Sequence, residues 1–84
     1  MSYQVVLKRS AEKDLDALQG SLFERMKRKL LALEEEPRPF GVQKLHGQEA
    51  YRLRVGDYRI LYLIDDTAKR IDIISVAHRR AAYR

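Results

Sequence analysis

Apolar and polar positions follow different periods in the two halves of the chain, and each period predicts a kind of element. Residues 2–8, SYQVVLK, alternate weakly and are rich in β-branched side chains, which predicts a first strand. A short helix should then run from Ser10, an expected N-cap, to Gly20. Its apolar positions recur at i, i+4 and i+7, namely Ala11, Leu15 and Leu18.

A second helical period begins directly afterwards. Ser21 and Glu24 form the pattern of a capping box, and an apolar stripe extends toward Glu36 through Leu22, Met26, Leu30 and Leu33. The segment PRPFG, residues 37–41, should stop this helix, because proline lacks the backbone N–H that a helix interior needs. The two helices are therefore expected to form an αα-hairpin.

The second half of the chain alternates with period two. This pattern predicts strands at residues 50–55, 58–65 and 70–77, with a Gly-Asp turn inside YRLRVGDYRILY, residues 51–62. The predicted order is βααβββ. We expect one α+β domain, residues 1–84, in which the helix hairpin covers one face of a small antiparallel sheet.

The two-residue turn determines which side chains are neighbours across the central hairpin. It places Arg54 opposite Arg59 and Arg52 opposite Leu61, all on one face of the sheet. The other face is aromatic and branched, and is suited to packing beneath the helices: Tyr51, Leu53, Val55, Tyr58, Ile60 and Tyr62. The arginines are therefore expected on the uncovered face.

Arginines directly opposite each other destabilise a hairpin, by a few tenths to about 1 kcal/mol. A bound phosphate would relieve this repulsion, because it accepts forked hydrogen bonds from more than one guanidinium. The alternative is an exposed arginine ladder whose repulsion Asp57 or Glu49 relieves.

The charge distribution agrees with a polyanionic partner. The chain carries 17 Lys and Arg against 12 Asp and Glu, a net charge of +5, and most of the excess lies after residue 49. A generally basic surface without a specific ligand is the simpler explanation. The chain has no cysteine, which excludes disulfides, thiolate metal sites and a cysteine nucleophile. Its apolar runs are too short to span a bilayer, so we expect a cytoplasmic protein without a membrane partner.

The last nine residues, VAHRRAAYR, interleave aromatic and cationic side chains: His78, Arg79, Arg80, Tyr83 and Arg84. Single-stranded RNA is often bound by such a mixture, because a ring stacks on an unpaired base while an arginine holds the adjacent phosphate. A frayed basic tail is the alternative.

Three motifs together resemble the RelE/ParE superfamily of toxins from toxin-antitoxin modules. They are KLHG at 44–47, YRLRVGDYRILYLID at 51–65 and ISVAHRRAAY at 74–83. The RelE branch cleaves messenger RNA in the ribosomal A site, and its sheet arginine, its arginine after the last strand and its C-terminal tyrosine match Arg59, Arg79 and Tyr83. The ParE branch poisons DNA gyrase and generally lacks the complete set. The resemblance therefore favours the RNase branch.

The resemblance implies a metal-free endoribonuclease without a cofactor, in which the 2′-hydroxyl of the substrate attacks the adjacent phosphorus. Arg59 and Arg79 would stabilise developing charge, Arg54 and Arg52 would position the RNA backbone, and Tyr83 would transfer the proton. His78 is the second candidate for that transfer. RNA contacts are expected from Arg52, Lys44, His78, Arg80 and Arg84. Arg52 and Arg54 depart from the family pattern, because lysine is common there and arginine is a poor base.

The expected partners are an acidic RelB-like antitoxin, the 30S A site of the ribosome and messenger RNA. The toxin-antitoxin complex should be hetero-oligomeric and should bind operator DNA through the antitoxin. Two other functions stay open at this point, a ParE-like gyrase inhibitor and a non-catalytic RNA-binding module. The RNase would cut messages, the gyrase poison would damage DNA, and the binding module would do neither.

Overall fold

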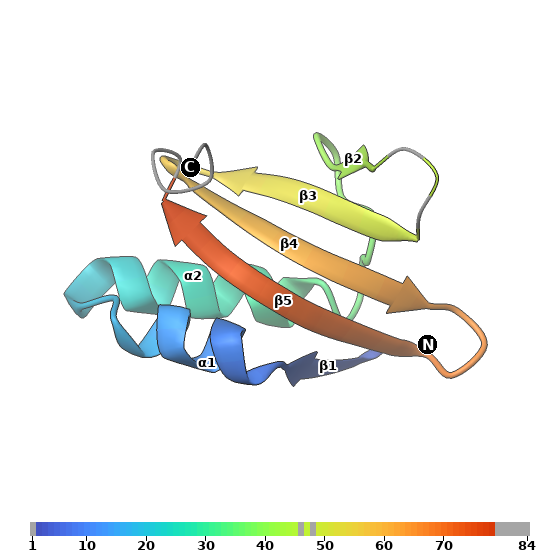
Figure 1. The fold of residues 1–84 in the computed structure, drawn as a ribbon, viewed down its shortest axis with the longest axis horizontal. Coiled ribbons are helices and arrows are strands. Elements are labelled where there is room, and N and C mark those ends of the chain that lie inside the picture. The colour runs from blue at the N-terminus through green and yellow to red at the C-terminus, as the bar shows by residue number, and fades with distance from the viewer. Residues whose placement is uncertain (1, 46, 48, 79–84) are drawn as a thin grey trace.

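The computed structural model describes residues 2–45, 47 and 49–78, and within them the chain forms two helices and five strands. They are β1 (Gln4–Leu7), α1 (Arg9–Asp16), α2 (Gly20–Ala32), β2 (Gln43–Lys44), β3 (Ala50–Val55), β4 (Tyr58–Asp65) and β5 (Arg70–His78). Both helices lie on the same side of the sheet (Figure 1). The α+β class and the helix pair on one face of the sheet are therefore confirmed.

The sheet has the strand order β1-β5-β4-β3-β2. Neighbours from β2 to β5 pair antiparallel, whereas β1 pairs in parallel with β5. The sheet is therefore mixed, and it includes the two-residue strand β2, which the predicted order βααβββ does not contain. No turn connects β1 to its partner, so the sequence period could not reveal its direction, and two residues are too few to show a period.

The central hairpin has the predicted register. Val55 pairs with Tyr58 and Arg54 pairs with Arg59, and the remaining pairs follow in step to Tyr51 and Tyr62. Gly56 has a φ of 60°, which the first central position of a type II′ turn requires and which L side chains rarely adopt. The turn glycine therefore sets the register and with it the face of every side chain in β3 and β4.

The core lies between the helices and one face of the sheet. It contains Ala11, Leu15, Met26, Leu30 and Leu33 from the helical side and Tyr51, Leu53, Val55, Ile60, Tyr62, Ile64, Ile71, Ile73 and Val76 from the sheet. Tyr62 is fully buried, and its hydroxyl donates a 2.8 Å hydrogen bond to the carbonyl of Pro37. The PRPFG segment is thus attached to the core through a strand residue.

The helix boundaries differ from the predicted ones at the starts and at the ends, because α1 ends at Asp16 and α2 ends at Ala32 instead of near Glu36. The N-cap of α1 is Lys8, and Ser10 lies within the first turn. Gly20 begins α2 instead of ending α1, and Gln19 occupies the N-cap without any side-chain cap from Ser21. The capping-box prediction with Glu24 was therefore wrong, because Ser21 already lies inside the helix. No described helix is long and apolar enough to cross a bilayer.

Strand β5 contains a register shift at the place where α1 side chains bond its backbone. Leu61 pairs with Ser75, whereas the next residue, Tyr62, pairs with Ile73, so β5 carries an extra residue at position 74. The hydroxyl of Ser10 donates a 2.6 Å hydrogen bond to the carbonyl of Ile74. One turn further along α1, Asp14 Oδ2 accepts a 2.9 Å bond from the N–H of Val76. The helix thus satisfies backbone groups of β5 beyond the last residue that pairs with β1.

Candidate functional site

The predicted arginine face exists on the side of the sheet opposite the helices. Arg54 lies directly opposite Arg59, and Arg52 lies opposite Leu61. Their neighbours along each strand, Leu53 and Ile60 among them, point into the core. The alternation of side chains therefore separates an apolar face from a cationic one within the same two strands.

Three guanidinium side chains of this face line one hollow. It has a volume of about 260 Å³ and is bounded by Gly41, Gln43, Arg52, Arg54 and Arg59. The lining contains no acidic residue. We call this the arginine hollow.

Neutral acceptors hold two of these arginines in place. Arg52 Nη2 donates a 2.7 Å hydrogen bond to Gln43 Oε1, and Arg54 Nε donates a 3.0 Å bond to the carbonyl of Gly56. Within the part of the chain that the structure describes, neither arginine forms a salt bridge. Their positive charge is therefore oriented but not neutralised, and a ligand anion would meet guanidinium groups already held in place.

Small side chains of β5 extend the same face. Arg52 and Arg59 also line an adjacent hollow of about 300 Å³, together with Leu45, Leu61, Ser75 and Ala77. The extra residue in β5 explains this lining: a strict two-residue alternation from Ile71 and Ile73 would turn Ser75 and Ala77 toward the core. With the register shift, Val76 enters the core instead and the small side chains face the arginines.

Two predicted RNA-binding residues lie elsewhere. Lys44 pairs with Tyr51 in the sheet, and its Nζ forms a 3.3 Å salt bridge with Glu49. His78 pairs with Tyr58, and the two rings meet edge to face with their centroids 5.1 Å apart. Both partners, Tyr51 and Tyr58, belong to the face that the helices cover. The structure therefore does not bring Lys44 or His78 to the arginine face.

Four predicted site residues lie outside the described residues: Arg79, Arg80, Tyr83 and Arg84. The roles assigned to them stay predictions. Conversely, the sequence did not predict that Gln43 lines the arginine hollow or that Ser75 and Ala77 line the adjacent one. The spacing of Gln43 from Arg52 would have indicated their contact only if β2 had been recognised as the strand next to β3.

A second polar cluster joins the PRPFG segment to the far end of the sheet. Arg38 forms a forked salt bridge with Asp66, with Nη2–Oδ2 and Nη1–Oδ1 distances of 2.8 and 3.2 Å, and its Nε donates to the hydroxyl of Tyr51 at 3.1 Å. Tyr3 donates a further 2.6 Å bond to Asp66 Oδ1. We call Arg38, Asp66, Tyr51 and Tyr3 the Arg38 clamp.

The clamp changes the ionisation of its members. The hydrogen bonds from Arg38 and Tyr3 lower the pKa of Asp66 to about 2, because they stabilise the carboxylate. The same bond to Asp66 raises the pKa of Arg38 further above its usual range. Burial raises the pKa of the nearby Tyr62 phenol. Arg38 and Asp66 therefore both stay charged over the whole physiological pH range.

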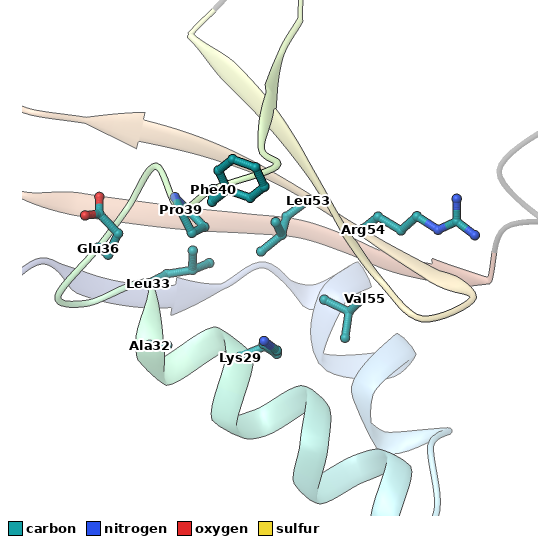
Figure 2. Close-up of a pocket in the computed structure, with 9 residues that line it drawn as sticks. All are labelled: Lys29, Ala32, Leu33, Glu36, Pro39, Phe40, Leu53, Arg54 and Val55. Atoms are coloured by element: carbon teal, nitrogen blue, oxygen red, sulfur yellow. The ribbon is translucent and has the colours of Figure 1, made fainter.

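An apolar hollow separates the PRPFG segment from α2. It has a volume of about 190 Å³, and Figure 2 shows Lys29, Ala32 and Leu33 on its helical side with Pro39, Phe40 and Leu53 across from them. Arg54 lines both this hollow and the arginine hollow. The chain therefore presents an apolar and a cationic recess on either side of one arginine.

The described residues contain no group of three or more His, Asp or Glu side chains placed to hold a metal ion. The described side chains that line the arginine hollow are cationic or neutral. Guanidinium forks fixed on a sheet bind phosphate or carboxylate groups in two-pronged geometry.

Comparison with known proteins identifies the family. The sequence model for the ParE toxin of type II toxin-antitoxin systems, parDE, matches residues 5–83. The chain belongs to this family. It is thus a RelE-like toxin of the RelE/ParE superfamily and part of a type II toxin-antitoxin system. The predicted family is confirmed.

Two curated relatives carry the RelE name. RelE1 of Methanocaldococcus jannaschii is 30% identical over 88 aligned residues, which cover 100% of this chain and 98% of the relative. The toxin RelE of Mycobacterium tuberculosis is 55% identical, but over 31 residues that make up 37% of this chain and 32% of the relative. The chain thus spans about a third of the second relative in that match.

Solved structures share the fold. The archaeal RelE-RelB complex from Pyrococcus horikoshii matches with a TM-score of 0.83 and 34% identity, covering 94% of this chain and 97% of that chain. The toxin-antitoxin complex RelBE2 from Mycobacterium tuberculosis matches with a TM-score of 0.82 and 28% identity, covering 94% and 100%. Free Escherichia coli RelE carrying two arginine substitutions matches with a TM-score of 0.80 and 28% identity, covering 99% of this chain and 90% of that chain.

Proposed function

We propose that this toxin is a ribosome-dependent endoribonuclease that cleaves messenger RNA in the A site and thereby inhibits translation. The observation that carries the proposal is the arginine hollow, which Arg52, Arg54 and Arg59 line together with Gly41 and Gln43. The RelE relatives support it, because they match across nearly the whole chain.

In the proposed reaction the 2′-hydroxyl of the RNA attacks the adjacent phosphorus. The bond to the 5′-oxygen breaks, which leaves a 2′,3′-cyclic phosphate and a 5′-hydroxyl. Arg59, with Arg79, stabilises the extra negative charge of the phosphoryl transition state, while Arg54 and Arg52 bind the flanking backbone. Removal of one such charge-stabilising group typically lowers the rate about 10²- to 10³-fold.

The 2′-hydroxyl must lose a proton and the 5′-oxygen must gain one. Tyr83 is the proposed group for this transfer, because arginine is a poor base and a phenol can both accept and donate the proton. His78 is disfavoured as the alternative, because its ring contacts Tyr58 on the helix-covered face. With no strong base on the arginine face, ordered presentation of the RNA by the ribosome would supply much of the rate.

The partner that restrains the toxin is proposed to be an acidic RelB-like antitoxin encoded beside it. RelE proteins of known structure occur in complexes with RelB, including those from Pyrococcus horikoshii and Escherichia coli. On this chain a hollow of about 240 Å³ between the helices and β1 offers apolar contacts from Val5, Leu7, Leu15, Phe23, Leu30 and Leu31. A disordered acidic segment would fold on this surface, with electrostatic attraction speeding the encounter.

Induction of the toxin in a bacterium, followed by mapping of RNA 5′ ends, tests the function. The RNase predicts new ends within translated codons, and their absence from an Arg59→Ala strain assigns them to this site. Growth arrest with double-strand DNA breaks and intact messages would instead favour a gyrase-directed toxin, the function that the ParE name of the family suggests. In purified form, equally rapid cutting of naked message and ribosome-bound message would contradict ribosome dependence.

A further inference from the structure

Phe40 is fully exposed in a segment whose neighbours are held in place. Its relative exposure is 104%, although a phenyl ring gains free energy from burial. On one side, Pro37 accepts the hydrogen bond from Tyr62 and Arg38 is bound in its clamp. On the other side, the N–H of Val42 donates to the carbonyl of Pro39 and closes a turn around the ring-bearing residue.

Phe40 precedes a residue of the arginine hollow in the chain. Phe40 lines the apolar hollow together with Leu53 and Arg54 (Figure 2), and Gly41, the next residue, lines the arginine hollow. Consecutive Cα atoms are about 3.8 Å apart, so the two recesses meet at this peptide. Gly41 has a φ of 90°, a conformation open to glycine, which lets the chain turn between them.

We propose that Phe40 stacks on an unpaired base of the RNA whose phosphate lies in the arginine hollow. This inference rests on the proposed RNA-directed function and adds a base-binding position to it. The base would lie against the outer face of the phenyl ring, and the backbone would pass over Gly41 toward Arg54 and Arg52.

Three observations favour a nucleobase as the occupant. A nucleotide carries an anionic and a flat apolar group side by side, as the arginine hollow and the ring require. The arginine hollow has no acidic lining residue, so its lining does not repel a phosphate. The clamp fixes the segment before binding, so that little conformational entropy is lost when the ring is covered.

The ring and the arginines should contribute to binding in distinguishable ways. Stacking involves no ion release, so removing the ring should weaken binding by the same factor at every salt concentration. Removing an arginine that contacts phosphate should reduce the salt dependence itself. This contrast separates a stacking residue from a generally disturbed surface.

The test measures binding of the full-length protein to a short, fluorescently labelled single-stranded RNA with 2′-O-methyl groups, which block attack by the 2′-hydroxyl. Phe40→Leu keeps apolar bulk and removes the flat ring, and Phe40→Trp keeps a ring. Arg54→Gln is the phosphate-contact comparison. Leu31→Ala is the matched control, because Leu31 is another exposed apolar side chain but lies on the helix side.

Phe40→Leu should weaken binding about 5- to 100-fold with an unchanged salt slope, whereas Phe40→Trp and Leu31→Ala should bind like the unmodified protein. An RNA of the same charge with abasic sites should bind the unmodified protein and Phe40→Leu equally. Thermal melting checks that every variant is folded, and the exposed position predicts little change.

Normal affinity of Phe40→Leu, with weakened binding by Arg54→Gln, would overturn the stacking inference and leave the RNA-directed function standing. Failure of the unmodified protein to bind the RNA at low salt would overturn both. If Phe40→Leu binds RNA normally but no longer retains the protein encoded by the neighbouring gene, the ring is a contact for that protein and the inference is wrong.

Discussion

Arg38 differs in its electrostatic surroundings from Arg52 and Arg54 on the sheet face. Arg38 is neutralised by a forked salt bridge to Asp66, and its guanidinium carbon lies 5.1 Å from the centre of the Tyr51 ring. Arg52 and Arg54 instead donate to the amide oxygen of Gln43 and to a backbone carbonyl. Those acceptors are uncharged, so they do not neutralise the positive charge of Arg52 and Arg54.

Arg38 therefore stabilises the fold through its salt bridge, whereas Arg52 and Arg54 are proposed to bind a ligand anion. Glu49, one of the two carboxylates that the sequence offered to neutralise the sheet arginines, contacts Lys44 and Tyr51 instead. Arg54 lies directly opposite Arg59, a pair of like charges whose repulsion a ligand anion could relieve. Substitution of a sheet arginine should therefore lower activity, whereas substitution of Arg38 should lower stability.

The largest expected difference is in activity. Arg59→Ala should lower the cleavage of messages on programmed ribosomes about 10²- to 10³-fold, because the variant loses charge stabilisation in the transition state. Arg38→Ala should retain most of that activity at a temperature where it is folded, and should melt at a lower temperature than Arg59→Ala. Quantified cleavage and thermal melting of both proteins decide this. Equal loss of activity in the two variants would show that the clamp takes part in the chemistry.

Tyr62→Phe should have the next largest effect, and it concerns stability. The change removes the hydroxyl that bonds to the carbonyl of Pro37, and the buried acceptor then loses its partner. Such a loss costs about 1–3 kcal/mol in the free energy of unfolding. Urea unfolding measures it, with Tyr3→Phe as a comparison because the Tyr3 hydroxyl serves an exposed carboxylate. A stability equal to that of the unmodified protein would mean that the Pro37 attachment contributes nothing.

Much of this arrangement could be read from the sequence, because the hairpin depends on local rules. Gly56 and the alternation around it predicted the register of Arg54 and Arg59 and the face on which they lie. The same rules fail where a contact spans many residues. The partner of β1 is β5, more than sixty residues away, and nothing in the period of β1 specifies a parallel pairing.

The placement of His78 shows why the site was predicted less well than the fold. Counting alternate residues along β5 requires knowledge of the extra residue at position 74. Its carbonyl is bonded by Ser10, and the N–H of Val76 by Asp14, both from a helix about sixty residues earlier in the chain. Sequence spacing therefore could not show that Ser75 and Ala77 face the arginines and that His78 meets Tyr58. The clamp between Arg38 and Asp66 likewise joins residues 28 positions apart.

Acid should weaken the clamp without affecting the arginine face. The pKa of Asp66 is lowered to about 2 in the folded protein, from an ordinary value near 4. Its contribution to stability is therefore complete above about pH 4 and is lost as the pH falls toward 2, because the unfolded chain then binds the proton more readily. Asp66→Asn should remove that part of the pH dependence. Urea midpoints at pH 7, 4 and 2.5 test this, and parallel curves for the two proteins would contradict it.

The smallest effect is expected from Lys44, whose charge Glu49 already offsets in an exposed salt bridge. Lys44→Gln should change the free energy of unfolding by about 0–1 kcal/mol. It should also leave RNA affinity and its salt slope unchanged, because Lys44 lies opposite Tyr51 and not on the arginine face. Arg52→Gln removes a charge from the neighbouring register position and should reduce the slope of log K against log salt by about 0.7, the value for one phosphate contact on a single strand. Titrations of the same 2′-O-methyl RNA at several salt concentrations compare the two. A larger change of slope for Lys44→Gln than for Arg52→Gln would show that RNA follows the outer edge of β2 instead of the arginine hollow.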